Sequence, residues 1–163
     1  MKKEELIEFI EKSFDGVENS KEITLHVAEA HDNYDYENDK KHREKDFIGS
    51  WQNVPSEHIK SCQNALSYVD KFGMRYYLPA YMIWYLKNLG VPDEIWSDHT
   101  LYSLDNHPND EKLSKYHKER FSLFSKEQLK ACAMFVKYCA EDEDNTDEYF
   151  AKKKYERYWS QYE

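Results

Sequence analysis

Residues 74 to 92 read MRYYLPAYMIWYLKNLGVP, and this stretch decides the fold. Large apolar side chains follow one another after Pro79, so they would cover nearly the whole circumference of a helix. A helix that is apolar all round has to be buried by its neighbours. Pro79 fits the first turn of such a helix, because its missing N–H would be unpaired there anyway, and Gly90 and Pro92 end it. We therefore predict a central buried helix from Pro79 to Leu89.

The composition of the whole sequence favours helices. The 163 residues include only four Gly and four Pro, too few for a collagen-like, linker-like or turn-dense all-β protein. Ile 7, Val 6 and Thr 3 give 16 β-branched residues, the type that strands prefer. The 26 aromatic residues indicate a folded protein despite a mean hydropathy of -1.00, because disordered sequences are poor in aromatic residues. We predict a compact, all-α single domain over residues 1–163, a bundle of about six to eight helices.

Apolar spacing and cap residues predict the other helices. Ser125 and Gln128 match a capping box, in which the serine hydroxyl accepts from the third amide and the glutamine reaches back. A helix opening at Ser56 carries a narrow apolar stripe and ends near Gly73. The remaining predicted helices are 3 to 14, a short helix capped by Thr24, 93 to 104, and a C-terminal helix capped by Asn145. The charged segment 33 to 45 is predicted to be an exposed helix or a loop.

The net charge of the protein limits its partners. Lys and Arg number 23 and Asp and Glu number 32, which gives a net charge of -9. Phosphate binding needs clustered cations, and the dense cationic runs at 40–43 and 152–154 lie beside acidic residues, as on a solvated face. We therefore expect no nucleic-acid partner. A negative field steers a basic partner, although many proteins are acidic only for solubility.

The cysteines and apolar runs indicate a cytoplasmic protein. Cys62, Cys132 and Cys139 form no CxxC pair and leave an odd count, so neither a disulfide framework nor a zinc ribbon is encoded. The N-terminus has no apolar run of signal-peptide length. The most apolar stretch, 76 to 89, is too short to span a bilayer, so we expect no membrane insertion.

The motifs of catalysis are missing from the sequence. There is no HExxH, no GxSxG and no glycine-rich phosphate loop, because the four glycines stand singly. We therefore assign no catalytic residue, no cofactor and no metal. The alternative is a small metal-dependent hydrolase. Its ligands would be His26, Glu29 and His31, with Asp32 and Asp98 or His99 contributing from elsewhere in the sequence.

Two features indicate protein binding instead. EDEDNTDE, residues 141 to 148, packs six acids into eight residues, either as an acidic patch or as a solvated connector that favours the next helix N-terminus. The last helix carries a tyrosine stripe, which suits either an interface or core packing. The predicted partner-binding residues are Asp32, Asp35, Glu37, Asp39, Glu141, Asp142, Glu143, Asp144, Tyr155, Tyr158 and Tyr162.

These features predict a non-catalytic, acidic protein-binding module. Its most concrete form is an immunity or antitoxin-like protein that occludes a basic toxin by charge and tyrosine contacts. A homodimer through the last helix is compatible with this function.

Two blocks of the sequence resemble an uncharacterised family of small, mostly bacterial proteins. WQNVP (51–55) and NALSYVDKFGMRYYLPAYMIWYL (64–86) are similar to its W-x-D/E-V-P, A-L-S and F-R-Y-Y-L-P-A-Y-M signature, with Asn53 in place of an acid and Met74 in place of Phe. The resemblance implies a shared fold unit and no established activity. The signature residues it assigns are Trp51, Val54, Pro55, Leu66, Arg75, Tyr76, Tyr77, Leu78, Pro79, Ala80 and Tyr81. As the lone arginine of this apolar block, Arg75 is predicted to pair with a carboxylate of a neighbouring helix, or else to bind an anion.

Overall fold

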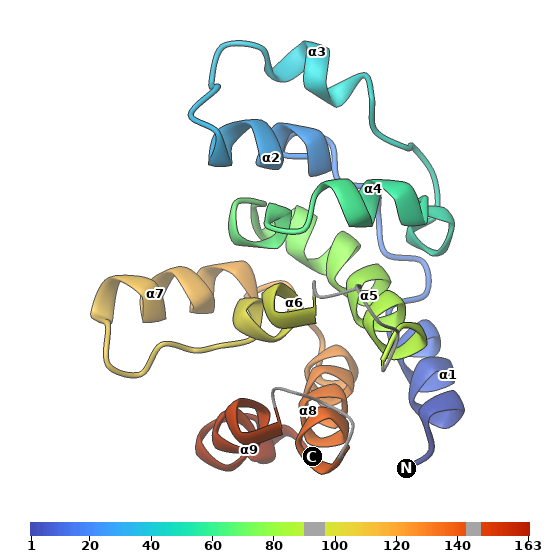
Figure 1. The fold of residues 1–163 in the computed structure, drawn as a ribbon, viewed down its shortest axis with the longest axis vertical. Coiled ribbons are helices and arrows are strands. Elements are labelled where there is room, and N and C mark those ends of the chain that lie inside the picture. The colour runs from blue at the N-terminus through green and yellow to red at the C-terminus, as the bar shows by residue number, and fades with distance from the viewer. Residues whose placement is uncertain (90–96, 143–147) are drawn as a thin grey trace.

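The computed structural model describes residues 1–89, 97–142 and 148–163, and these residues form α-helices and short 3-10 helices without a strand (Figure 1). The helices are α1 (Lys3–Ser13), α2 (Leu25–Asp32), α3 (Asp39–Arg43), α4 (Ser56–Ser61), α5 (Lys71–Lys87), α6 (Ser97–Ser103), α7 (Glu111–Arg120), α8 (Lys126–Glu141) and α9 (Glu148–Arg157), with the 3-10 helices η1 (Trp51–Asn53), η2 (Ala65–Ser67) and η3 (Trp159–Tyr162). The predicted all-α class is confirmed.

The central helix is α5, and 13 of its 17 residues are buried. Helices α1, α4, α6 and α7 pack against it. The sequence prediction places its start at Pro79, but the helix begins eight residues earlier. Asp70 caps it by accepting from the main-chain N of Gly73 at 2.8 Å. Buried side chains on both sides of Pro79 hold the helix together across the hydrogen bond that the proline cannot make.

The predicted helix from Ser56 to Gly73 is wrong. This segment forms α4, a turn and η2, and Gly73 lies in the first turn of α5. A Cβ atom on Gly73 would lie 2.8 Å from the Cβ of Val69 and 3.1 Å from the main-chain oxygen of Ile23. The glycine is therefore there for close packing and does not end a helix.

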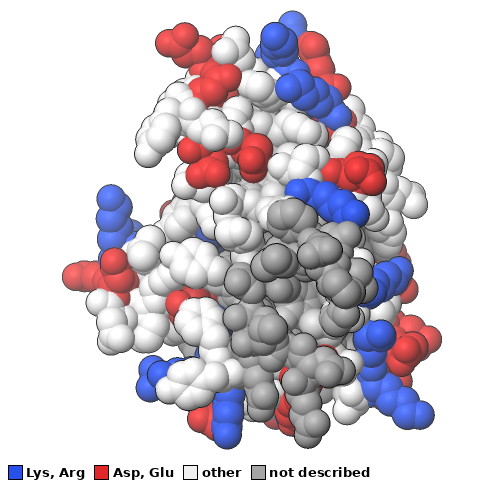
Figure 2. Space-filling view, viewed as in Figure 1, with Lys and Arg blue, Asp and Glu red and all other residues white. Residues whose placement is uncertain are grey.

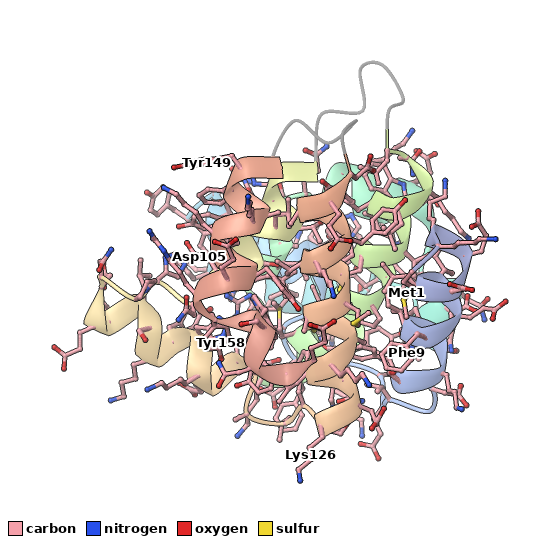
Figure 3. All side chains as sticks on the ribbon, turned by 90° about the horizontal axis from the view of Figure 1, so that it is seen from below. Met1, Phe9, Asp105, Lys126, Tyr149 and Tyr158 are labelled. Carbon is pink, nitrogen blue, oxygen red and sulfur yellow. The ribbon has the colours of Figure 1, made fainter. Side chains whose placement is uncertain are left out.

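Helix α8 forms as predicted. The Ser125 hydroxyl accepts from the Gln128 amide at 3.1 Å, and the Gln128 side chain accepts from the Ser125 amide at 3.0 Å, so the capping box is confirmed. Figure 3 shows α8 beside α9, with α1 on its other flank, and both pairs of helices are in contact. The apolar stripe of α8, which includes Cys132 and Cys139, is buried between them.

Helices α2 and α3 lie at the opposite end of the long axis from α8 and α9 (Figure 1). Thr24 stands at the N-cap position of α2, but its hydroxyl makes no capping hydrogen bond. The charged segment 33 to 45 contains the short helix α3, in which no residue is buried. Helix α3 therefore depends on polar contacts, whereas α2 buries four of its eight residues.

The C-terminal third adds two departures from the predictions. The charged run before Ser125 forms a full helix, α7, which Asp110 caps by accepting from Leu113 N at 3.0 Å. Helix α9 ends at Arg157, and the Trp159 indole then donates to the main-chain oxygen of Leu104 at 2.8 Å. The expected Asn145 cap and residues 93 to 96 lie outside the described residues. No helix in the described part of the protein is long and apolar enough to cross a membrane.

Candidate functional site

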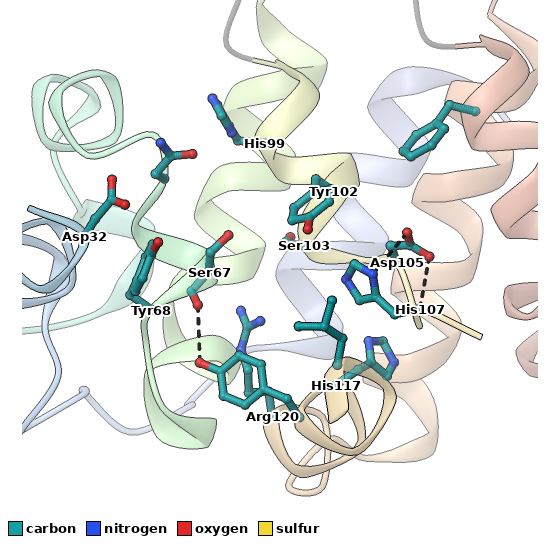
Figure 4. A pocket seen from close by; sticks show the side chains of 14 residues that line it. Asp32, Ser67, Tyr68, His99, Tyr102, Ser103, Asp105, His107, His117 and Arg120 are labelled. Carbon is teal, nitrogen blue, oxygen red and sulfur yellow. Dashed lines mark hydrogen bonds and ion pairs between the residues drawn. The ribbon is translucent and has the colours of Figure 1, made fainter. Parts of the chain in front are cut away.

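A cleft of about 810 Å³ opens on one side of α5. Its lining comes from α2, the η2 turn, α6, the segment 105–107, α7 and α9. Figure 4 shows Asp32 and Tyr68 on one side, Tyr102 and His107 on the other, and Arg120 at the base. The cleft therefore lies between the α2–α3 end of the molecule and the helices α6 and α7.

The rim of the cleft is apolar and exposed. Five large side chains, Tyr68, Tyr102, Leu113, Tyr116 and Phe150, line the cleft and are each between 37% and 45% exposed. They are five of the eleven large apolar side chains that are exposed among the described residues. Scattered exposed apolar residues need no explanation, whereas a convergent group marks an interaction surface.

Arg120 places a cation at the base of the cleft. It is 7% exposed, its Nη2 donates to the sulfur of Met74 at 3.2 Å, and its guanidinium lies 4.9 Å from the centre of the Tyr116 ring. Its Nε is buried without a hydrogen-bond partner, and no carboxylate of a described residue lies within ion-pair distance. Burial lowers the pKa of Arg120, but arginine stays protonated in proteins, so a charge is held here without a counter-ion from the described residues.

The carboxylates of the cleft already have partners. Asp105 accepts from the Lys154 ammonium at 3.2 Å and from the main-chain N of His107, also at 3.2 Å. Burial acts to raise the Asp105 pKa, but these two contacts outweigh it, so the pKa is lowered. Asp32 holds the Tyr68 hydroxyl by a hydrogen bond, which raises the tyrosine pKa. Neither acid neutralises Arg120.

His117 forms part of the inner wall of the cleft. Its ring stacks on Phe121 with centroids 4.4 Å apart and meets the rings of Tyr158 and Trp159 edge-on. Burial lowers the His117 pKa to about 4, and the charge of Arg120 adds to this effect. The ring is therefore neutral at pH 7, and it fixes the C-terminal segment to α7.

A second polar cluster lies beneath α2. His26 on α2, Asp46 after α3 and His58 on α4 bring one potential ligand atom each to within 4.8 Å of one another. Of the predicted ligands His26, Glu29 and His31, only His26 belongs to this cluster. His31 instead contacts Asp39 at 2.8 Å. Sequence spacing does not single out Asp46 and His58, because they lie 20 and 32 residues from His26.

The predicted acidic residues do not lie together. Asp32 lines the cleft, Asp35 and Asp39 accept from His42 and His31, and Glu37 is exposed. Glu141 and Asp142 end α8, away from α2 and α3, while Glu143 and Asp144 lie outside the described residues. On the face in Figure 2, acidic side chains at the top are interspersed with Lys and Arg, and others lie around the rim. The described acidic residues thus form no single patch.

The predicted tyrosine stripe is half-buried. Tyr155, Tyr158 and Tyr162 pack against the core, and the Tyr158 and Tyr162 rings meet with centroids 5.7 Å apart. Figure 3 shows Tyr158 facing the neighbouring helices. These rings contribute to packing at the C-terminal end of the protein.

Several signature residues fix loops to the core. The Trp51 indole donates to Phe14 O at 2.8 Å, the Tyr76 hydroxyl to Gly49 O at 2.6 Å, and the Tyr81 hydroxyl to Cys62 O at 2.5 Å. Arg75 donates to the main-chain oxygen of Leu123 at 3.3 Å. The carboxylate partner predicted for Arg75 is absent among the described residues, because a carbonyl on the segment between α7 and α8 takes that place.

These observations define an all-helical protein with an aromatic cleft beside its central helix. The protein belongs to a family of unknown function (DUF6714), whose model matches residues 2–163. This confirms the expectation of an uncharacterised family. No curated protein matches the sequence, and no solved structure matches it.

Proposed function

We propose that this protein is a non-catalytic protein-binding module that receives a segment of a partner protein in its cleft. The observation that carries the proposal is the convergence of five exposed apolar side chains on one cleft. Tyrosine supplies contact area with little loss of conformational entropy and keeps a polar tip, which suits a reversible interface. Asp105 is paired with Lys154 and Asp32 with the Tyr68 hydroxyl, and these partners favour a binding role over acid–base catalysis.

The net charge supports a basic partner. A net charge of -9 accelerates the encounter with a cationic protein and orients it at long range. Asp32, Asp35, Glu37 and Asp39 lie on the α2–α3 side of the cleft, where they would meet such a surface. In its most concrete form the protein is an immunity or antitoxin-like protein of the bacterial cytoplasm that occludes a basic toxin.

Arg120 specifies one feature of the inserted segment. A buried cation without a counter-ion among the described residues raises the free energy of the unbound protein, and a carboxylate entering the cleft would relieve that cost. A segment tip that carries one acidic side chain, or the terminal carboxylate of the partner, meets this requirement. A partner that is basic overall is attracted by the net charge of -9, and its acidic tip would neutralise Arg120.

Calorimetry with two cleft variants tests the proposal. The titrant is the basic C-terminal domain of a large secreted protein encoded beside this gene, where such a neighbour exists. We expect binding tighter than about 1 µM, weakened at least tenfold by Tyr102→Ser, since interface aromatic residues dominate binding energy. Tyr149→Ser is the matched control, because Tyr149 is 70% exposed and lies outside the cleft lining.

Arg120→Met separates binding from stability. A methionine replaces the buried guanidinium by an apolar side chain of similar length. The free energy of unfolding should therefore stay level or rise, while the affinity for the partner falls. The same calorimetry and a urea titration measure both quantities. Absence of binding at micromolar concentration, or equal losses in Tyr102→Ser and Tyr149→Ser, would contradict the proposal.

A further inference from the structure

We infer that His26, Asp46 and His58 form a binding site for a divalent transition metal, with Zn²⁺ as the best match. The site lies outside the lining of the cleft and is independent of the function proposed above. Three separate segments supply its ligands: α2, the loop after α3, and α4. A metal there would join the α2–α3 end of the molecule to α4.

The three side chains are already close enough for coordination. His26 Nδ1 lies 2.5 Å from Asp46 Oδ1, and the His26 and His58 rings meet edge-on with centroids 5.1 Å apart. Zn²⁺ binds nitrogen and oxygen at about 2.0–2.2 Å, so tetrahedral ligand atoms stand roughly 3.3 Å from one another. Small rotations of the side chains would open the His26–Asp46 pair and close the remaining separations, which are all under 4.8 Å.

Unsatisfied polar atoms at the cluster point to a missing ligand. His58 Nδ1 is buried and has no hydrogen-bond partner, and Oε2 of Glu29 is in the same state. Buried polar atoms in folded proteins are almost always paired, so the unpaired Nδ1 of His58, beside the His26–Asp46 pair, needs a cause. Glu29 lies one helical turn beyond His26 on α2, which places it to accept a hydrogen bond from a metal-bound water.

The carboxylate is already oriented for this role. The Asp46 side chain is only 3% exposed, and its Oδ2 accepts from the main-chain N of His26 at 2.9 Å. That hydrogen bond fixes Oδ2, and Oδ1 faces the His26 ring. Hydrogen bonds of this kind orient the ligands of metal sites. Two imidazoles and one carboxylate suit Zn²⁺ with an open fourth position, whereas Mg²⁺ and Ca²⁺ prefer sites made of oxygen alone.

Zinc titration of the untagged protein tests the site. The protein is stripped with a chelator, and Zn²⁺ is titrated in competition with a chromophoric chelator. We expect one equivalent to bind, and His58→Gln to weaken binding by at least tenfold. His31→Gln is the matched control, because it removes another histidine of α2 that contacts an aspartate but lies outside the cluster.

Imidazole NMR of the wild-type protein gives a second readout that needs no variant. On zinc addition the ring nitrogen signals of His26 and His58 should shift together, while that of His31 stays in place. Lack of saturable binding, equal losses in His58→Gln and His31→Gln, or shifts confined to other histidines would each overturn the inference. In that case His26 and Asp46 form only a hydrogen-bonded cap for α2.

Discussion

Helices α8 and α3, at opposite ends of the molecule, are held in place by different forces. At the α8 end, seven of the sixteen residues of the helix are buried, and they pack between α1 and α9. At the other end α2 buries four of its eight residues, but α3 buries none, and His–Asp contacts hold the segment after α2 in place. The three pairs are His26–Asp46, His31–Asp39 and His42–Asp35, at 2.5, 2.8 and 2.8 Å.

This difference predicts where the fold is robust and where it opens. Apolar burial contributes about 25 cal/mol per Å² and involves no titratable group. Partly exposed contacts such as His31–Asp39 and His42–Asp35 contribute only about 0–1 kcal/mol each. Helix α3 should therefore open locally at a lower free energy than α8. The candidate metal ligand Asp46 lies just after α3, so a bound ion would tie this weakly held segment to α2 and α4.

Removing a core side chain from α8 should give the largest effect. Phe135 is fully buried and meets the Tyr85 ring edge-on with centroids 5.3 Å apart. Phe135→Ala should lower the free energy of unfolding by about 3–5 kcal/mol, because it removes apolar contacts and leaves a cavity. Urea unfolding at pH 7 measures this value. Phe150→Ala is the control, since Phe150 is 44% exposed, and a similar loss there would contradict the comparison.

The strongly held end is also the part that sequence predicts best. The Ser125 capping box and the apolar stripe of α8 are local patterns, set by neighbours within a few residues, and both are confirmed. The apolar run after Pro79 predicts the central helix for the same reason. It does not predict the start at Lys71, because tertiary burial on both sides of Pro79 overrides the preference of proline for a first turn.

The weakly held end and the cleft are beyond the reach of local patterns. His26 meets Asp46 and His58 only because the backbone turns back twice, over 20 and 32 residues. The apolar stripe from Ile59 to Val69 is buried as predicted, but it spans two short helices rather than one. The cleft joins residues from Asp32 to Phe150, so only the folded protein shows that exposed aromatic side chains converge there.

Acid should weaken the contact between α7 and the C-terminal segment first. Burial lowers the His117 pKa to about 4, compared with 6.5 for a histidine side chain in water. Between pH 6.5 and 4, His117 is protonated in the unfolded protein but stays neutral in the folded protein. The free energy of unfolding therefore falls as the pH falls. The full loss is about 3 kcal/mol. Urea midpoints at pH 7 and 4.5, followed by tryptophan fluorescence, measure it.

His117→Phe is the variant that assigns this loss. A phenylalanine keeps the stacking on Phe121 and cannot take up a proton, so the drop between pH 7 and 4.5 should shrink by most of that amount. The His–Asp pairs remain intact in this variant and serve as an internal reference. An unchanged pH dependence would mean that groups other than His117 cause the loss.

The smallest effect should come from the His31–Asp39 pair. Its side chains are 17% and 34% exposed, so His31→Gln and Asp39→Asn should each lower the free energy of unfolding by about 0.5–1 kcal/mol. The double variant should lose less than the sum, because both changes remove the same contact. Hydrogen exchange should meanwhile accelerate in α3 and stay constant in α8. A loss as large as that of Phe135→Ala, or faster exchange in both helices, would mean that the two ends unfold as one unit and that the polar contacts of α3 support the whole core.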